Sequence, residues 1–161
     1  YLQVYNEQGD LISSVTTDAS GNVTYENNHS LTYDEYSNMT IDILKNENDI
    51  VQSIDYSDYV YSNDGLILSQ VDSVNATYYG HTETIRETEF TYNSDGYETY
   101  KKEVGFGAFN ADSGKIMRTT ETFSTYEDNG NLLHSDELVE YLVGEEMYSY
   151  EVHLDYTWIL I

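Results

Sequence analysis

The chain has 161 residues, a length that fits one domain with a core of its own. Its 30 acidic and 6 basic residues give a formal charge of −24, a field that repels phosphate backbones and anionic membranes, so no nucleic-acid partner is expected. The absence of cysteine excludes disulfides, thiol catalysis and cysteine-ligated zinc. No apolar run approaches the roughly 20 residues of a membrane-spanning helix, so no transmembrane segment is predicted.

Turn signals follow one another along the chain at short intervals. Most contain Gly next to Asn, Asp or Ser, residues that supply the positive φ angles of tight hairpins at little steric cost. In chain order they lie at 7–10, 18–22, 46–49, 62–65, 94–96, 110–114, 127–131 and 143–146, with weaker signals near Asn28, Ser37 and Asn75. About 11 turns predict about 12 strands in simple up-and-down order.

The segments between these turns alternate with period two and are rich in Thr, Tyr, Val and Ile, as strands prefer. We therefore predict an all-β fold, an antiparallel up-and-down meander that forms a single domain over residues 1–161. Because strand edges must be hidden, the meander is expected to curl into a barrel or a strongly bent sheet, with two packed sheets as the alternative. A barrel of about 12 strands is too wide to be filled by side chains and would enclose a lumen or groove.

Aromatic side chains are the expected lining of such a groove. Tyr100 and Phe106 share one face of their predicted strand, and the final segment MYSYEVHLDYTWILI places its Tyr and Trp residues on one face. Flat rings with polar tips suit a glycan or another small amphipathic ligand. The ligand-binding candidates are Tyr100, Phe106, Tyr148, Tyr150, Tyr156 and Trp158. The alternative is that these rings form the core.

The other face of the final strand is polar and contains histidine. A two-residue turn at 144–145 would place His153 opposite Asp136. The same register would place His134 opposite Asp155, and two imidazoles with two carboxylates could hold a divalent ion. The alternative, an exposed checkerboard of weak cross-strand attractions, is favoured, so no metal site is predicted.

Motifs for catalysis are missing. His134, Ser135 and Asp136 cannot form a triad, because consecutive strand residues point to opposite faces. We therefore predict a protein that is not an enzyme, with no catalytic residue and no cofactor. An acidic-residue hydrolase is kept as an alternative, since 30 carboxylates can form close pairs. Calcium is a further candidate partner through Asp64, Asp95 or Asp128, although Asp beside Gly is ordinary turn chemistry.

Tyrosine recurs ahead of the turns at intervals of 28 to 34 residues. The units are YNEQGDL, YDEYSNM, YSNDGLI, YNSDGYE and YEDNGNL, beginning at Tyr5, Tyr33, Tyr61, Tyr92 and Tyr126. This pattern resembles the YD repeats of RHS-type bacterial surface and secreted proteins. It is also similar to uncharacterised hairpin-repeat proteins secreted by gut bacteria, some of them with a porin-like barrel fold.

The resemblance implies a secreted, periplasmic or cell-surface location in a bacterium and a non-catalytic binding or scaffold role. A start at Tyr1 without a signal peptide is typical of a mature or trimmed chain. A purely structural repeat segment of a larger surface protein is the remaining alternative. The oligomeric state is not predicted.

Overall fold

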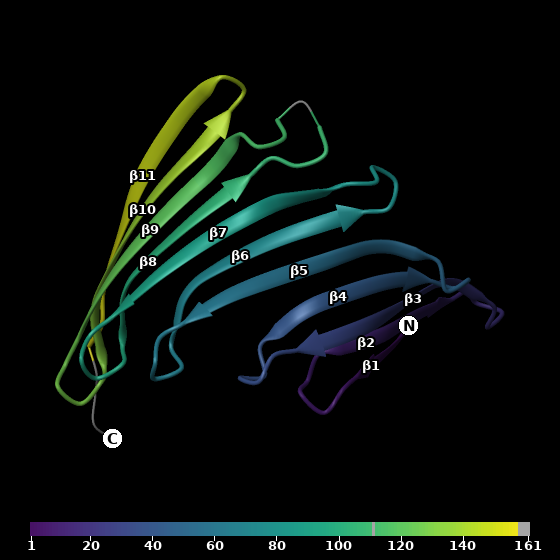
Figure 1. Cartoon of the computed structure of the whole chain (residues 1–161), viewed down its shortest axis with the longest axis horizontal. Coiled ribbons are helices and arrows are strands. Elements are labelled where there is room, and N and C mark those ends of the chain that lie inside the picture. Colours follow the sequence, from purple (N-terminus) through teal and green to yellow (C-terminus); the bar gives the residue numbers. More distant parts are fainter. Residues whose placement is uncertain (111, 158–161) are drawn as a thin grey trace. The chain divides into compact units, whose positions relative to one another are not determined.

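The computed structural model describes residues 1–110 and 112–157, and all the regular elements within these ranges are strands. The strands are β1 (Leu2–Tyr5), β2 (Leu11–Thr17), β3 (Val23–Tyr33), β4 (Met39–Asn46), β5 (Val51–Tyr61), β6 (Ile67–Ala76), β7 (Thr82–Tyr92), β8 (Glu98–Phe106), β9 (Ile116–Tyr126), β10 (Leu132–Val143) and β11 (Glu146–Asp155) (Figure 1). None of the described residues belongs to a helix that is long and apolar enough to cross a membrane.

The predicted all-β antiparallel meander is confirmed. The strands stand in chain order in one 11-stranded sheet, with β1 and β11 at the two ends of that order, so the sheet is not closed. The alternative of two packed sheets is wrong. The described residues contain one strand fewer than the predicted number because the turn expected near Asn28 does not form: Asn28 lies inside β3, where its side-chain amide donates to Glu26 Oε1 at 3.0 Å.

The chain divides into two compact units. The first contains residues 1–58 and 72–83, and the second contains residues 59–71 and 84–161. Each unit is described by itself below. The single domain over residues 1–161 stays a prediction.

One turn geometry recurs seven times in the described part of the chain. In each turn the first backbone N–H donates to the fifth carbonyl, the fourth N–H donates to the first carbonyl, and the fourth residue has a φ between 61° and 90°. In six of the seven, a side-chain oxygen of the first residue also accepts from the fifth N–H. The turns span 6–10, 18–22, 34–38, 46–50, 62–66, 93–97 and 127–131. Five of these turns directly follow the tyrosines of the sequence units, so each sequence unit marks one turn of this geometry.

The repeated tyrosines end alternate strands, since β1, β3, β5, β7 and β9 each finish on one of them. In the first compact unit, the Tyr33 hydroxyl contacts the turn at 6–10, which belongs to the preceding repeat. It donates to Asp10 Oδ2 at 2.6 Å and accepts from Asn6 Nδ2 at 2.6 Å. The bond to the Asp10 carboxylate raises the pKa of Tyr33 above its ordinary value. Tyr33 therefore links its hairpin to the one before it.

The second unit shows the same link in two forms. The Tyr92 hydroxyl donates to the carbonyl of Ile67, directly after the turn at 62–66, at 2.9 Å. The Tyr126 ring stacks on Tyr97, the last residue of the turn at 93–97, with ring centroids 5.2 Å apart. We call this chain of tyrosine-to-turn contacts the tyrosine ladder.

Few described side chains are fully buried. The buried hydrophobic residue among them is Val139, which is 1% exposed, and the buried polar residues are Ser14, Asp72 and Thr88. The Asp72 carboxylate accepts from the Ser57 hydroxyl at 2.6 Å, so its burial is compensated. The sizeable core expected from chain length is therefore absent from the described residues, and cross-strand pairs carry much of the stabilisation.

Candidate functional site

The hairpin of β10 and β11 has the register predicted from its turn. Val143 pairs with Glu146 across Gly144 and Glu145, and the pairing continues without a bulge to the far end of the hairpin. His134 lies opposite Asp155, and Asp136 lies opposite His153, which confirms both predicted pairs. Since side chains alternate along each strand, the hairpin and the neighbouring β9 carry two different surfaces.

Three tyrosines gather on one of these surfaces, which we call the aromatic face. Tyr141 on β10 pairs directly with Tyr148 on β11, and their rings stack with centroids 5.8 Å apart. Tyr150 packs edge-on against Tyr141, with centroids 6.1 Å apart. Tyr148 and Tyr150 remain 45% and 47% exposed, so a ligand can reach both rings.

A hollow of about 340 Å³ lies on the aromatic face. Its lining consists of Arg118, Val139, Tyr141 and Tyr150. Arg118 on β9 pairs with Tyr141, and its Nε donates to the hydroxyl of Thr120 at 3.1 Å. The hollow therefore combines two aromatic rings, one aliphatic side chain and one guanidinium, a mixture typical of small-ligand sites.

The Tyr148 hydroxyl has a carboxylate partner beside this hollow. It donates to Glu146 Oε2 at 2.6 Å, and this bond raises the pKa of Tyr148. The phenol stays neutral at physiological pH and its ring is held in place by the bond.

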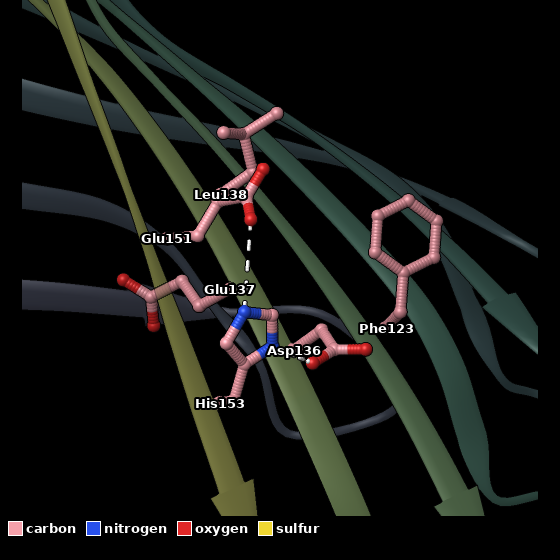
Figure 2. A pocket seen from close by; sticks show the side chains of 6 residues that line it. All are labelled: Phe123, Asp136, Glu137, Leu138, Glu151 and His153. Atoms are coloured by element: carbon pink, nitrogen blue, oxygen red, sulfur yellow. Dashed lines mark hydrogen bonds and ion pairs between the residues drawn. The ribbon is translucent and has the colours of Figure 1, made fainter.

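The opposite surface of the same strands carries His134, Asp136 and His153, and we call it the histidine face. His134 Nε2 lies 2.9 Å from Asp136 Oδ1, and His153 Nδ1 contacts the same oxygen. Figure 2 shows the His153 ring between Asp136 and the carboxylate of Glu151, whose Oε2 lies 3.6 Å from His153 Nε2. The other nitrogen of His134, Nδ1, lies 2.7 Å from Asp155 Oδ1.

Charge pairing shifts the pKa of each central group on the histidine face. The bonds to Asp155 and Asp136 raise the pKa of His134, and the bond to Asp136 raises the pKa of His153. The same imidazoles lower the pKa of Asp136. Without any other ligand, the cluster is a set of ion pairs that favours protonated imidazoles.

These ion pairs should stabilise the fold most in mildly acidic solution. Their contribution is lost as pH falls through the lowered pKa of Asp136, and again as pH rises through the raised pKa values of His134 and His153. Replacing Asp136 with Asn should therefore lower the melting temperature more at about pH 5 than at about pH 9. Thermal unfolding in buffer containing a chelator measures this, with Asp95→Asn as the control. An equal fall in melting temperature at both pH values would contradict the pairing of Asp136 with protonated His134 and His153.

The structure brings together only part of the predicted aromatic lining. Tyr148 and Tyr150 lie on the aromatic face as described. Tyr100 pairs with Phe123 at a ring-centroid distance of 5.0 Å, and Phe123 pairs with Asp136, so Tyr100 belongs to the histidine face. Tyr100 was predicted to lie on the same surface as Tyr148 and Tyr150, but it lies on the opposite surface of the sheet.

Two further candidates, Phe106 and Tyr156, are not among the residues that line the hollow. Phe106 is half-buried at the end of β8, beyond a register shift next to Gly105. Tyr156 follows β11, is 38% exposed, and its backbone N–H donates to the carbonyl of Leu133 at 2.9 Å. Trp158 lies outside the described residues.

Sequence reasoning missed three of the four residues that line the hollow, namely Arg118, Val139 and Tyr141. The register that placed His153 opposite Asp136 also puts Tyr141 opposite Tyr148 and Val139 opposite Tyr150. The same reasoning could therefore have predicted Tyr141 and Val139. Arg118 could not be predicted in this way, because the pairing of β9 with β10 includes a register shift near Leu132.

In the described part of the chain, the side chains of the acidic turns are not among those that gather around one point as metal ligands could. Among the described residues, three or more potential ligands within reach of one ion occur at His134, Asp136 and His153. The turn at 93–97 uses Asn93 Oδ1 for its own backbone, accepting from the N–H groups of Asp95 and Tyr97 at 3.0 and 2.9 Å. Calcium binding through the turns stays a prediction.

The fold and these surfaces define an all-β protein built from hairpin repeats. No protein-family model matches the chain. No curated protein matches its sequence. Among solved structures, the chain is similar to a protein of unknown function from Bacteroides fragilis, with 12% identity and a TM-score of 0.48 over 83% of this chain and 94% of that one.

Proposed function

We propose that the chain is an extracytoplasmic, non-catalytic binding module that holds a neutral glycan on its aromatic face. The observation that carries this proposal is the hollow where the rings of Tyr141 and Tyr150 meet Val139 and the guanidinium of Arg118. Its lining supplies stacking surfaces and hydrogen-bond donors rather than an acid–base pair.

The chemistry of the hollow favours a sugar over other amphipathic ligands. The C–H faces of a pyranose ring can stack on exposed tyrosine rings, and its hydroxyls can accept from a guanidinium. A ligand with many negative charges would be repelled by the chain's formal charge of −24. A neutral glycan can stack on the rings and bind the guanidinium, and the negative charge of the chain does not repel it.

The repeated turns support the scaffold part of the proposal. Seven turns of one geometry in the described part of the chain form a regular frame that can present side chains on a sheet surface. The likeness of the tyrosine units to YD repeats of bacterial surface and secreted proteins supports an extracytoplasmic location.

A screen of immobilised neutral oligosaccharides tests the proposal, followed by calorimetric titration of the oligosaccharide that gives the strongest signal. Replacing Tyr150 with Ala should weaken its binding about fivefold or more, because one stacked ring contributes on the order of 1 kcal/mol. The matched control is Tyr25→Ala on β3, which removes a ring that is 56% exposed in the other compact unit.

Two results would count against the proposal. The first is the absence of binding to every oligosaccharide in the screen. The second is binding that Tyr150→Ala leaves unchanged. Analysis of the incubated oligosaccharide for cleavage products checks the non-catalytic part, since turnover would favour the acidic-residue hydrolase instead.

A purely structural repeat segment of a larger surface protein is the second candidate. The tyrosine ladder favours it, because contacts such as Tyr33 to Asp10 and Tyr92 to Ile67 serve to join consecutive hairpins. This role requires no ligand, so it predicts an empty screen together with a stable, folded chain.

A further inference from the structure

The histidine face holds a cluster that the glycan proposal does not use. The ligand atoms of His134, Asp136 and His153 all lie within 4.8 Å of one another. They come from neighbouring strands whose register is continuous, so the backbone fixes the spacing of the three side chains. One nitrogen of each imidazole is directed at Asp136 Oδ1.

The remaining nitrogen of each imidazole also has a carboxylate partner. His134 Nδ1 lies 2.7 Å from Asp155 Oδ1, and His153 Nε2 lies 3.6 Å from Glu151 Oε2. Histidines that bind metals commonly donate their second N–H to a carboxylate, which fixes the tautomer and makes the ligating nitrogen more basic. His134 has this hydrogen bond, and His153 has a longer ion-pair contact of the same kind. The inner nitrogens of both imidazoles face Asp136 Oδ1.

We propose that His134, Asp136 and His153 bind one divalent transition-metal ion of the zinc class, with Asp155 and Glu151 orienting the imidazoles. Two nitrogen ligands and one carboxylate suit Zn²⁺, Co²⁺ or Ni²⁺, whereas Ca²⁺ and Mg²⁺ prefer sites made of oxygen alone. Three protein ligands leave a coordination position open for water or for a donor from a ligand.

The surroundings favour an ion at this place. Three carboxylates, those of Asp136, Glu151 and Asp155, gather around two imidazoles, so a dication offsets their mutual repulsion. Asp136 and His153 share one pocket with Glu151 and with the apolar side chains of Phe123 and Leu138 (Figure 2). Neither feature depends on the aromatic face, so the two proposals stand or fall separately.

Calorimetric titration of the whole chain with ZnCl₂ tests the site, after treatment with a chelator and removal of the chelator. We expect one ion per chain at neutral pH and weaker binding in acid, because the ion must displace the imidazole protons. Substitution of Co²⁺ should give the visible absorption of a site with nitrogen ligands. Titration with CaCl₂ should show no comparable binding at this site.

Variants assign the binding to the cluster. His153→Gln should abolish the zinc signal, and Glu151→Gln, which removes an orienting carboxylate, should weaken it roughly tenfold. The matched control is His81→Gln, since His81 is also exposed and its Nε2 lies 2.7 Å from Glu83 Oε1. Circular dichroism verifies that each variant is folded.

The proposal is overturned if the wild-type chain takes up no zinc. It is also overturned if His153→Gln and His81→Gln have equal effects. Loss of the zinc signal in His153→Gln, with its retention in the folded His81→Gln variant, is the result that supports it.

Discussion

Replacing Gly130 with Ala should lower the free energy of unfolding by about 2 kcal/mol or more, through backbone strain and overpacking together. Gly130 has a φ of +88° in the turn at 127–131, a conformation that L residues adopt at a cost. A Cβ at this position would also clash with the hydroxyl oxygen of Tyr97. The Tyr97 ring cannot move away freely, because it stacks on Tyr126 in the tyrosine ladder.

Gly96→Ala separates the two causes. Gly96 occupies the same position of the turn at 93–97 with a φ of +84°, and a Cβ there would meet no atom within 4 Å. This control should therefore cost only the backbone strain, about 1 kcal/mol. Urea unfolding of both variants measures the difference. Equal destabilisation would show that the ladder contact adds nothing to the turn.

Replacing Val139 with Ala should have the second-largest effect, a loss of about 1.5 kcal/mol for the two methylene equivalents removed. Val139 is 1% exposed and lies between Thr120 on β9 and Tyr150 on β11. Few hydrophobic side chains are buried among the described residues, so few neighbours can repack into the space that the removed methyl groups leave.

The comparison is Val152→Ala, on the same face of the neighbouring strand. Val152 is 36% exposed, so removing its methyl groups should cost less than about 1 kcal/mol. Equilibrium unfolding again provides the measurement. A loss at Val152 as large as that at Val139 would mean that burial on the aromatic face does not decide stability.

The turns and the register of the last hairpin could be predicted from sequence because both depend on local chemistry. The stretch TYNSDGYETY forms the expected turn at 93–97, where Asn93 accepts from the turn backbone and Gly96 supplies the positive φ. A two-residue turn at 144–145 then fixed every pair of β10 and β11, including Asp136 with His153. Asn28 misled the same reasoning, because asparagine also fits a strand when its amide finds a partner such as Glu26.

The residues that make up the aromatic face and the histidine face could be predicted only in part. Placing Tyr100 relative to Tyr150 requires the register of β8, β9 and β10 in succession, and shifts near Gly105 and Leu132 interrupt that register. A single added residue reverses the side on which all later side chains lie. Arg118 depends on the same registers, so its place in the hollow is visible only in the structure.

The most direct test of the binding proposal follows the tyrosine ring signals by NMR during titration with the neutral oligosaccharide selected in the screen. The account predicts that the signals of Tyr141, Tyr148 and Tyr150 shift together, while those of Tyr25 and of Tyr100 on the histidine face stay in place. Shifts at Tyr100 or Tyr25 with none at Tyr150, or no shift at any tyrosine, would contradict the assignment of the aromatic face as the ligand site.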